Sequence, residues 1–158
     1  MPILETRAQL WPDEAACAAA ARALARHAAL ADAFIELHGP LGAGKTTFVR
    51  HLLHALGVEG RVKSPTYAVL EPYQLMRNGV PFDISHFDFY RFNDPQEWED
   101  AGFRDVFASR GLKLAEWPEK AEGLLPEADL SIHIEPGEGD ARSARFEACT
   151  HRGAGLLA

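Results

Sequence analysis

The sequence predicts a single α/β domain of three layers, built on a sheet that mixes parallel and antiparallel strands. A short apolar segment at residues 33–38, a glycine-rich loop and an amphipathic helix follow one another, and this strand–loop–helix order is typical of a parallel sheet. Asn78-Gly79 lies between two strand-like segments and predicts a hairpin, which adds antiparallel pairing. The 158 residues contain no repeat and no long linker, so one domain at 1–150 and a loose tail at 151–158 are expected.

The first half of the chain carries its own start and stop signals. Residues 3–6 predict a short edge strand, and Pro12-Asp13-Glu14 predicts the start of a helix that runs to about residue 29. After the strand at 33–38 and the loop, a second helix begins near Lys45 and ends at a Gly57 cap. Its buried face is marked by apolar residues at helical spacing, namely Phe48, Val49, Leu52, Leu53 and Leu56.

The second half predicts mainly strands. We expect a loop over residues 58–66, strands at 67–73 and 82–89, a short helix from Pro95, and a buried strand at 112–116. A final hairpin joins residues 132–134 and 145–149 through a turn at 137–140.

Composition narrows the class of protein. Hydrophobic residues make up 47% and charged residues 25%, as in an ordinary soluble globular domain. The net charge of −7 disfavours a protein that grips nucleic acid by itself, because that needs a basic face. Cys17 and Cys149 form no C-x-x-C pair and predict free thiols in a reducing compartment. With no apolar run of membrane length and no secretory segment, the expected location is the cytoplasm.

Residues 39–46 fit G-x-x-x-x-G-K-[ST], the phosphate-binding loop (P-loop) of nucleoside triphosphatases. Glycines let backbone amides surround a phosphate without interference from side chains, and the following helix directs its positive end toward the anion. Lys45 would reach the β- and γ-phosphates, and the Thr46 hydroxyl would take one place in a Mg²⁺ shell. The sequence therefore predicts a P-loop NTPase-like fold.

A triphosphatase of this kind also needs an acidic residue near the metal, and two strands offer one. Asp88 ends one apolar strand and Glu116 ends another. Each could instead be an ordinary surface carboxylate, but with the phosphate loop present we expect one of them in the metal shell. Whether the metal contact is direct or through water stays open. Thr66, in Ser64-Pro65-Thr66, could supply a switch hydroxyl or lie in a simple proline turn.

Four segments together resemble the TsaE family, formerly YjeE: the loop continued to Phe48, Ser64-Pro65-Thr66-Tyr67, residues 86–91, and Glu116-Trp117-Pro118. The resemblance implies an ATP- and Mg²⁺-binding ATPase. Such a protein works with the TsaD–TsaB complex in forming threonylcarbamoyladenosine in tRNA, does not itself transfer the threonylcarbamoyl group, and meets tRNA only indirectly.

The resemblance also implies roles for individual residues. Lys45, Thr66, Asp88 and Glu116 would act in hydrolysis, and Thr46, Asp88 and Glu116 at the metal. The nucleotide would be bound by Gly39, Leu41, Gly42, Ala43, Gly44, Lys45, Thr46 and Thr47 of the loop, with Glu14, Trp117 and Arg142 beside it.

Three other functions compete with this one. A small-molecule kinase shares the loop, but no Asp follows Lys45 before Thr66 and no arginine-rich lid is present in the sequence. A GTPase is disfavoured because the chain has no N-K-x-D segment. A binding module in which ATP only holds an interface together is the third possibility.

Overall fold

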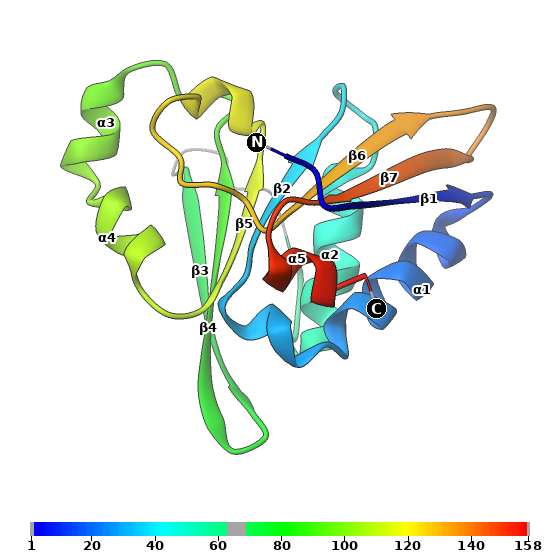
Figure 1. Cartoon of the computed structure of the whole chain (residues 1–158), viewed down its shortest axis with the longest axis horizontal. Helices are drawn as coiled ribbons and strands as arrows, with labels where there is room; N and C mark the ends of the chain where they lie inside the picture. Colours follow the sequence, from blue (N-terminus) through cyan, green and yellow to red (C-terminus); the bar gives the residue numbers. More distant parts are fainter. Residues whose placement is uncertain (1, 63–68, 158) are drawn as a thin grey trace.

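A computed structural model describes residues 2–62 and 69–157 of the chain. Its centre is a seven-stranded sheet in the order β1-β7-β6-β2-β5-β4-β3 (Figure 1). The strands are β1 (Glu5–Trp11), β2 (Phe34–His38), β3 (Leu70–Arg77), β4 (Val80–Asp88), β5 (Leu112–Glu116), β6 (Leu130–Pro136) and β7 (Arg142–Ala148). The predicted α/β fold with a mixed sheet is confirmed.

The four central strands are parallel and the outer strands are antiparallel. β2 pairs in parallel with β5 and β6, and β4 pairs in parallel with β5. Antiparallel pairing joins β3 to β4 at one side, and joins β6, β7 and β1 at the other. Because the carboxyl ends of parallel strands meet at one edge, residues that end β2, β4 and β5 lie close together there.

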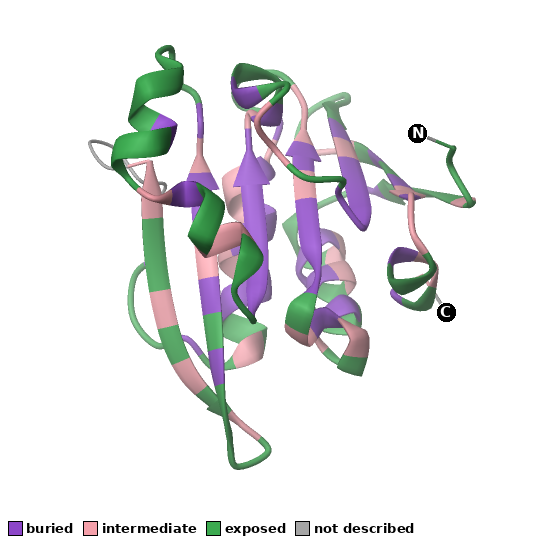
Figure 2. Cartoon of the chain, turned by 60° about the vertical axis from the view of Figure 1, so that its left-hand side comes forward, coloured by how far each residue is buried: buried purple, intermediate pink, exposed green. Residues whose placement is uncertain are grey.

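Helices cover both faces and make the three predicted layers. On one face, α1 (Glu14–Ala25) and α2 (Lys45–Leu56) bury a core that includes Leu24 and Leu52. On the other face lie α3 (Pro95–Asp100), α4 (Phe103–Ala108) and the 3₁₀ turn Pro118–Ala121, with a core that includes Trp98. Figure 2 shows the buried residues concentrated in the central strands. Packed helices on both faces therefore support the carboxyl edge of the sheet.

Two predicted N-terminal boundaries were wrong. The first strand runs to Trp11 instead of residue 6, because it pairs with β7 and Trp11 packs in parallel on Phe48 at 5.6 Å between ring centroids. The first helix ends at Ala25, and a separate 3₁₀ turn follows at Ala28–Asp32. Arg77 of the β3–β4 hairpin donates hydrogen bonds to the carbonyls of Ala25 and His27, each at 3.0 Å, which satisfies groups exposed by the end of the helix.

The predicted loose tail is also wrong. His151–Gly155 form the short helix α5, whose first turn is capped by Thr150: its hydroxyl accepts from the Gly153 amide at 3.0 Å. Leu156 is buried in the main core. The segment is therefore packed onto the domain.

The remaining predicted elements agree with the structure apart from their ends. The strand at 112–116 and the Gly57 cap of α2 are confirmed, and both hairpins form. Arg142, predicted just before the last strand, is its first residue. Residues 63–68, which carry the predicted switch residue Thr66 and the start of the strand predicted at 67–73, lie outside the described residues.

Candidate functional site

The phosphate loop connects the end of β2 to the start of α2. Gly39 follows β2 with φ of 149°, and a Cβ there would lie 2.3 Å from the carbonyl oxygen of Ile134. Gly44 caps α2 in a left-handed conformation with φ of 107°. The backbone therefore takes a path at both ends of the loop that a side chain would block or strain. This path brings the N-terminus of α2 to the carboxyl edge of the sheet.

Lys45 is nearly buried at the base of this loop, with 5% of its surface exposed. Its ammonium group donates to the carbonyl of Gly39 and, at 3.4 Å, to that of Pro40. The Trp117 ring covers it, with Nζ 3.5 Å from the ring centroid. Burial lowers the pKa of Lys45 below its ordinary value, and nearby carboxylates, Glu116 first, oppose that shift.

The two candidate acids end neighbouring strands in matching register. Asp88 of β4 pairs with Glu116 of β5. Glu116 is 2% exposed, and its Oε1 accepts a hydrogen bond from the Thr46 hydroxyl at 2.8 Å. Asp88 Oδ1 accepts from the Tyr90 amide at 3.0 Å. The structure thus joins the phosphate loop to Glu116 by a hydrogen bond, and Asp88 lines the same cavity as the loop.

Sequence reasoning missed His86. Its Nε2 lies 2.6 Å from Glu116 Oε2, and the imidazole is fully buried. A signal for it was available, because residues two apart in a strand face the same side of a sheet, so His86 shares a face with Asp88.

These residues line a cavity of about 380 Å³ at the carboxyl edge. Its lining includes nearly all the predicted site residues, namely Leu41, Gly42, Ala43, Gly44, Lys45, Thr46, Thr47, Asp88, Glu116, Trp117 and Arg142, and adds Tyr90. Two described site residues do not line this cavity. Gly39, the first residue of the loop, lies against Ile134, and Glu14 lines a different cavity.

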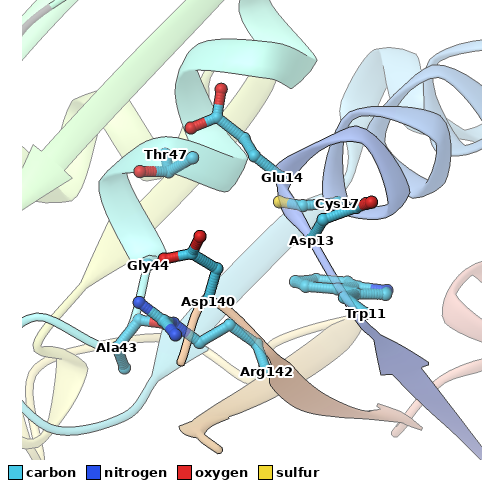
Figure 3. A pocket seen from close by; sticks show the side chains of 9 residues that line it. All are labelled: Trp11, Asp13, Glu14, Cys17, Ala43, Gly44, Thr47, Asp140 and Arg142. Carbon is cyan, nitrogen blue, oxygen red and sulfur yellow. The ribbon is translucent and has the colours of Figure 1, made fainter. Parts of the chain in front are cut away.

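Glu14 lines a second cavity, of about 250 Å³, on the α1 side of the loop (Figure 3). Ala43, Gly44, Thr47 and Arg142 line both cavities. The Arg142 Nε–H donates to the Ala43 carbonyl at 2.9 Å, which ties the start of β7 to the loop.

Four residues of the second cavity were not predicted: Trp11, Asp13, Cys17 and Asp140. They come from the end of β1, the start of α1 and the β6–β7 turn (Figure 3). Trp11, Asp13 and Cys17 lie close together in the sequence, but Asp140 lies far along the chain, so no local motif contains all four. Burial raises the pKa of the Cys17 thiol to about 11, with the Glu14 charge adding to the shift.

Within residues 2–62 and 69–157, no three His, Cys, Asp or Glu side chains gather into a group that could hold a metal ion. None of the helices found in those residues is long and apolar enough to cross a membrane.

The glycine loop between a central parallel strand and a helix, with Lys45 and Thr46 opening that helix, defines a P-loop NTPase-like protein. The model of the family "Threonylcarbamoyl adenosine biosynthesis protein TsaE" matches residues 11–144, and the chain belongs to that family. Its role lies in threonylcarbamoyladenosine biosynthesis on tRNA.

Individual relatives agree with this assignment. The chain is 43% identical over 123 residues to the tRNA threonylcarbamoyladenosine biosynthesis protein TsaE of Haemophilus influenzae, covering 78% of this chain and 75% of the relative. It is 37% identical over 118 residues to the protein of the same name from Bacillus subtilis, covering 75% and 71%. The crystal structure of Bacillus subtilis YdiB superposes with a TM-score of 0.77 at 27% identity, over 99% of this chain and 95% of that one.

Proposed function

We propose that this protein is an ATPase subunit that binds ATP with Mg²⁺ and works with the TsaD–TsaB complex in modifying tRNA. The observation that carries the proposal is the hydrogen bond of 2.8 Å between Thr46 of the phosphate loop and Glu116 of the neighbouring strand. It brings a loop hydroxyl and a strand-end carboxylate together, beside a buried lysine, at the edge where ligands bind in α/β sheets.

The phosphates of ATP would occupy the larger cavity, where Lys45 and the α2 N-terminus supply positive charge. Lys45 would exchange its contacts with the loop carbonyls for contacts with phosphate oxygens. The second cavity adjoins the first through Ala43, Gly44, Thr47 and Arg142, and we assign the nucleoside to it. Glu14 and Arg142 would then lie beside the nucleoside.

The donor atoms fit Mg²⁺ better than a transition metal. Mg²⁺ prefers oxygen ligands and is usually held by one or two carboxylates together with phosphates and water. Thr46 and Glu116 offer such oxygens 2.8 Å apart, and Asp88 pairs with Glu116 across the strands. A site completed by phosphate oxygens does not need three protein carboxylates, which accords with the absence of such a group among the described residues.

Hydrolysis would depend on how the site positions the attacking water and on the charges that it places around the phosphates. Mg²⁺, when bound, neutralises charge that develops on the phosphates. Lys45 would add a second positive charge, and the Asp88 and Glu116 carboxylates would orient the attacking water. Thr66 remains a predicted switch residue. Slow turnover by the isolated chain is expected, because a partner often completes the site of such hydrolases.

Family membership and charge support the proposed partners. A chain of net charge −7 is poorly suited to hold tRNA by itself, so contact through the TsaD–TsaB complex is expected. In that complex, ATP hydrolysis would permit repeated rounds of modification, in the cytoplasm.

The first experiment measures ATP binding by calorimetry with and without Mg²⁺, and phosphate release with and without TsaD–TsaB. Lys45→Ala should abolish binding. Glu116→Ala should keep ATP binding and assembly at saturating Mg²⁺ but block multi-turnover modification, while Glu135→Ala, an exposed glutamate in β6, should behave as wild type.

Three outcomes would contradict this proposal. No uptake of ATP by the folded protein, alone or with the complex, removes it. Normal modification by a variant that cannot hydrolyse ATP favours a passive binding module. A phosphorylated metabolite in place of free phosphate identifies a kinase.

A further inference from the structure

His86 and Glu116 form a buried pair directly behind the phosphate loop. The imidazole Nε2 lies 2.6 Å from Glu116 Oε2, and the two side chains are 0% and 2% exposed. A buried carboxylate is costly unless hydrogen-bond donors contact it. His86 supplies one such donor from the strand next to that of Glu116.

The two oxygens of Glu116 contact different parts of the site. Oε2 faces His86 of β4, and Oε1 accepts from the Thr46 hydroxyl at 2.8 Å. The carboxylate therefore bridges the sheet and the phosphate loop. The two oxygens belong to one planar carboxylate group, so a contact that holds Oε2 restricts where Oε1 can lie.

The surroundings of His86 decide which ring nitrogen donates. Within the part of the chain that the structure describes, Nδ1 is buried and has no hydrogen-bond partner. A proton on Nδ1 would thus be left without an acceptor there, whereas a proton on Nε2 faces a carboxylate oxygen. The tautomer with its proton on Nε2 is therefore favoured, and His86 acts as the donor.

We propose that His86 is a positioning residue, which holds Glu116 in the orientation that serves Thr46 and the metal. The inference rests on the proposed function and deepens it. Groups behind a metal ligand commonly fix its orientation, and their loss typically reduces metal affinity or activity about 10- to 100-fold. His86 itself lines neither of the two cavities, so its effect would be exerted through Glu116.

A purely structural role for this pair makes a different prediction. If His86 only stabilises the core, replacing it lowers stability and leaves the response to Mg²⁺ unchanged in the protein that remains folded. If it positions Glu116, the loss appears in the Mg²⁺-dependent part of ATP binding, because ATP without metal contacts mainly the loop and Lys45.

Three substitutions separate these roles. His86→Leu removes the donor. His86→Gln keeps an amide N–H near the position of Nε2, while His86→Asn is polar but too short to place its amide there. Ile84→Val is the matched control, because Ile84 lies on the same strand and face, is 1% exposed, and belongs to the core cluster.

Calorimetry measures ATP affinity in EDTA and over a range of Mg²⁺ concentrations. His86→Leu and His86→Asn should keep wild-type affinity in EDTA to within about twofold, and raise the half-saturating Mg²⁺ concentration about 10- to 100-fold. His86→Gln should recover most of that loss, and Ile84→Val should match wild type. If His86→Leu fails to fold, the comparison of His86→Asn with His86→Gln still distinguishes a positioning role from a purely structural one.

Crystal structures of the nucleotide-free variants provide a readout that does not depend on ATP. In His86→Asn, the Glu116 carboxylate should leave hydrogen-bond distance of the Thr46 hydroxyl, and in His86→Gln it should stay. An unmoved Glu116, or Mg²⁺ dependence equal to that of Ile84→Val, overturns the positioning role. Failure of wild-type protein to bind ATP overturns the proposed function instead, and the crystal structures then still test whether His86 orients Glu116.

Discussion

The indole ring of Trp117 lies over the ammonium group of Lys45, with Nζ 3.5 Å from the ring centroid. Trp117 takes this position in a left-handed backbone conformation, with φ of 55° and ψ of 47°. Tyr90 packs against its ring at 4.9 Å between centroids. The left-handed conformation costs a residue with a side chain about 1–2 kcal/mol, so the cover over Lys45 is held under backbone strain.

This strain can be measured by comparing two truncations. Trp117→Gly and Trp117→Ala both remove the ring, but only glycine relieves the backbone. We expect the glycine variant to be about 1 kcal/mol more stable than the alanine variant in urea denaturation. At Ala19, exposed within α1, the order should reverse, since Ala19→Gly costs about 0.5–1 kcal/mol. Equal or greater stability of Trp117→Ala would show that residue 117 is unstrained.

The Cys17 thiol should react slowly at neutral pH. Burial raises its pKa from an ordinary value of 9.0 to about 11, so at pH 8 the reactive thiolate would be about 100-fold scarcer than for a free cysteine. In a Cys149→Ser background, the rate of alkylation should rise with pH toward an inflection near pH 11. An inflection at or below pH 9 would contradict this.

The raised pKa of the Cys17 thiol also makes the free energy of unfolding depend on pH. Between pH 9 and about 11, the unfolded chain releases the Cys17 proton while the folded chain keeps it. The unfolded state then binds fewer protons, so the free energy of unfolding falls as pH rises. Cys17→Ala should show a shallower fall over this window in urea titrations, and an identical slope would argue against the shift.

The packing of α5 predicts opposite results for two glycines in one short helix. A Cβ at Gly153 would lie 1.8 Å from the carbonyl oxygen of Asp129, whereas at Gly155 the nearest heavy atom is the Cβ of Ala29 at 4.0 Å. Gly153→Ala should cost about 1–3 kcal/mol or more, because backbone must move. Gly155→Ala should be neutral or slightly stabilising. Thermal unfolding of both variants tests this, and equal melting temperatures would mean that α5 is not packed as described.

Arg142 should contribute to ATP binding through its shape as well as its charge. The Nε–H of its planar guanidinium reaches the Ala43 carbonyl at 2.9 Å, a contact that a lysine ammonium cannot reproduce in the same geometry. Arg142→Lys is expected to lower ATP affinity about tenfold, or about 1.4 kcal/mol, which is near the lower end of the contribution of a hydrogen bond to a charged group. Arg145→Lys, exposed on the same strand, provides the control. Unchanged affinity in Arg142→Lys would remove this residue from the nucleotide site.

Local patterns allowed much of the site to be predicted from the sequence. The phosphate loop, the helix after it and the strand that ends at Glu116 are each specified by neighbouring residues. The sequence also placed Asp88 and Glu116 at the ends of strands, although it did not predict that the two residues pair. These elements needed no knowledge of distant contacts.

The features that were missed depend on contacts between distant segments. His86 meets Glu116 across 30 positions, and Arg77 meets Ala25 across 52. The C-terminal residues carry two glycines and no helical or strand period, yet Asp129 accepts a hydrogen bond of 2.7 Å from Thr150, 21 positions away, which fixes the cap of α5. Such contacts are determined by the folded topology. The alternation along β4 places His86 on the same face as Asp88, but it does not specify the contact with Glu116.

Successive side chains of β4 face opposite sides of the sheet, and this alternation restricts where residues could be inserted or deleted. Phe87 belongs to the core under α3 and α4, while its neighbours His86 and Asp88 face the phosphate loop. Inserting or deleting one residue in the last half of β4 would move the aromatic ring toward the cavity beside the phosphate loop and a carboxylate into the apolar core. Gains and losses of residues are therefore better tolerated at the exposed Asn78-Gly79 turn.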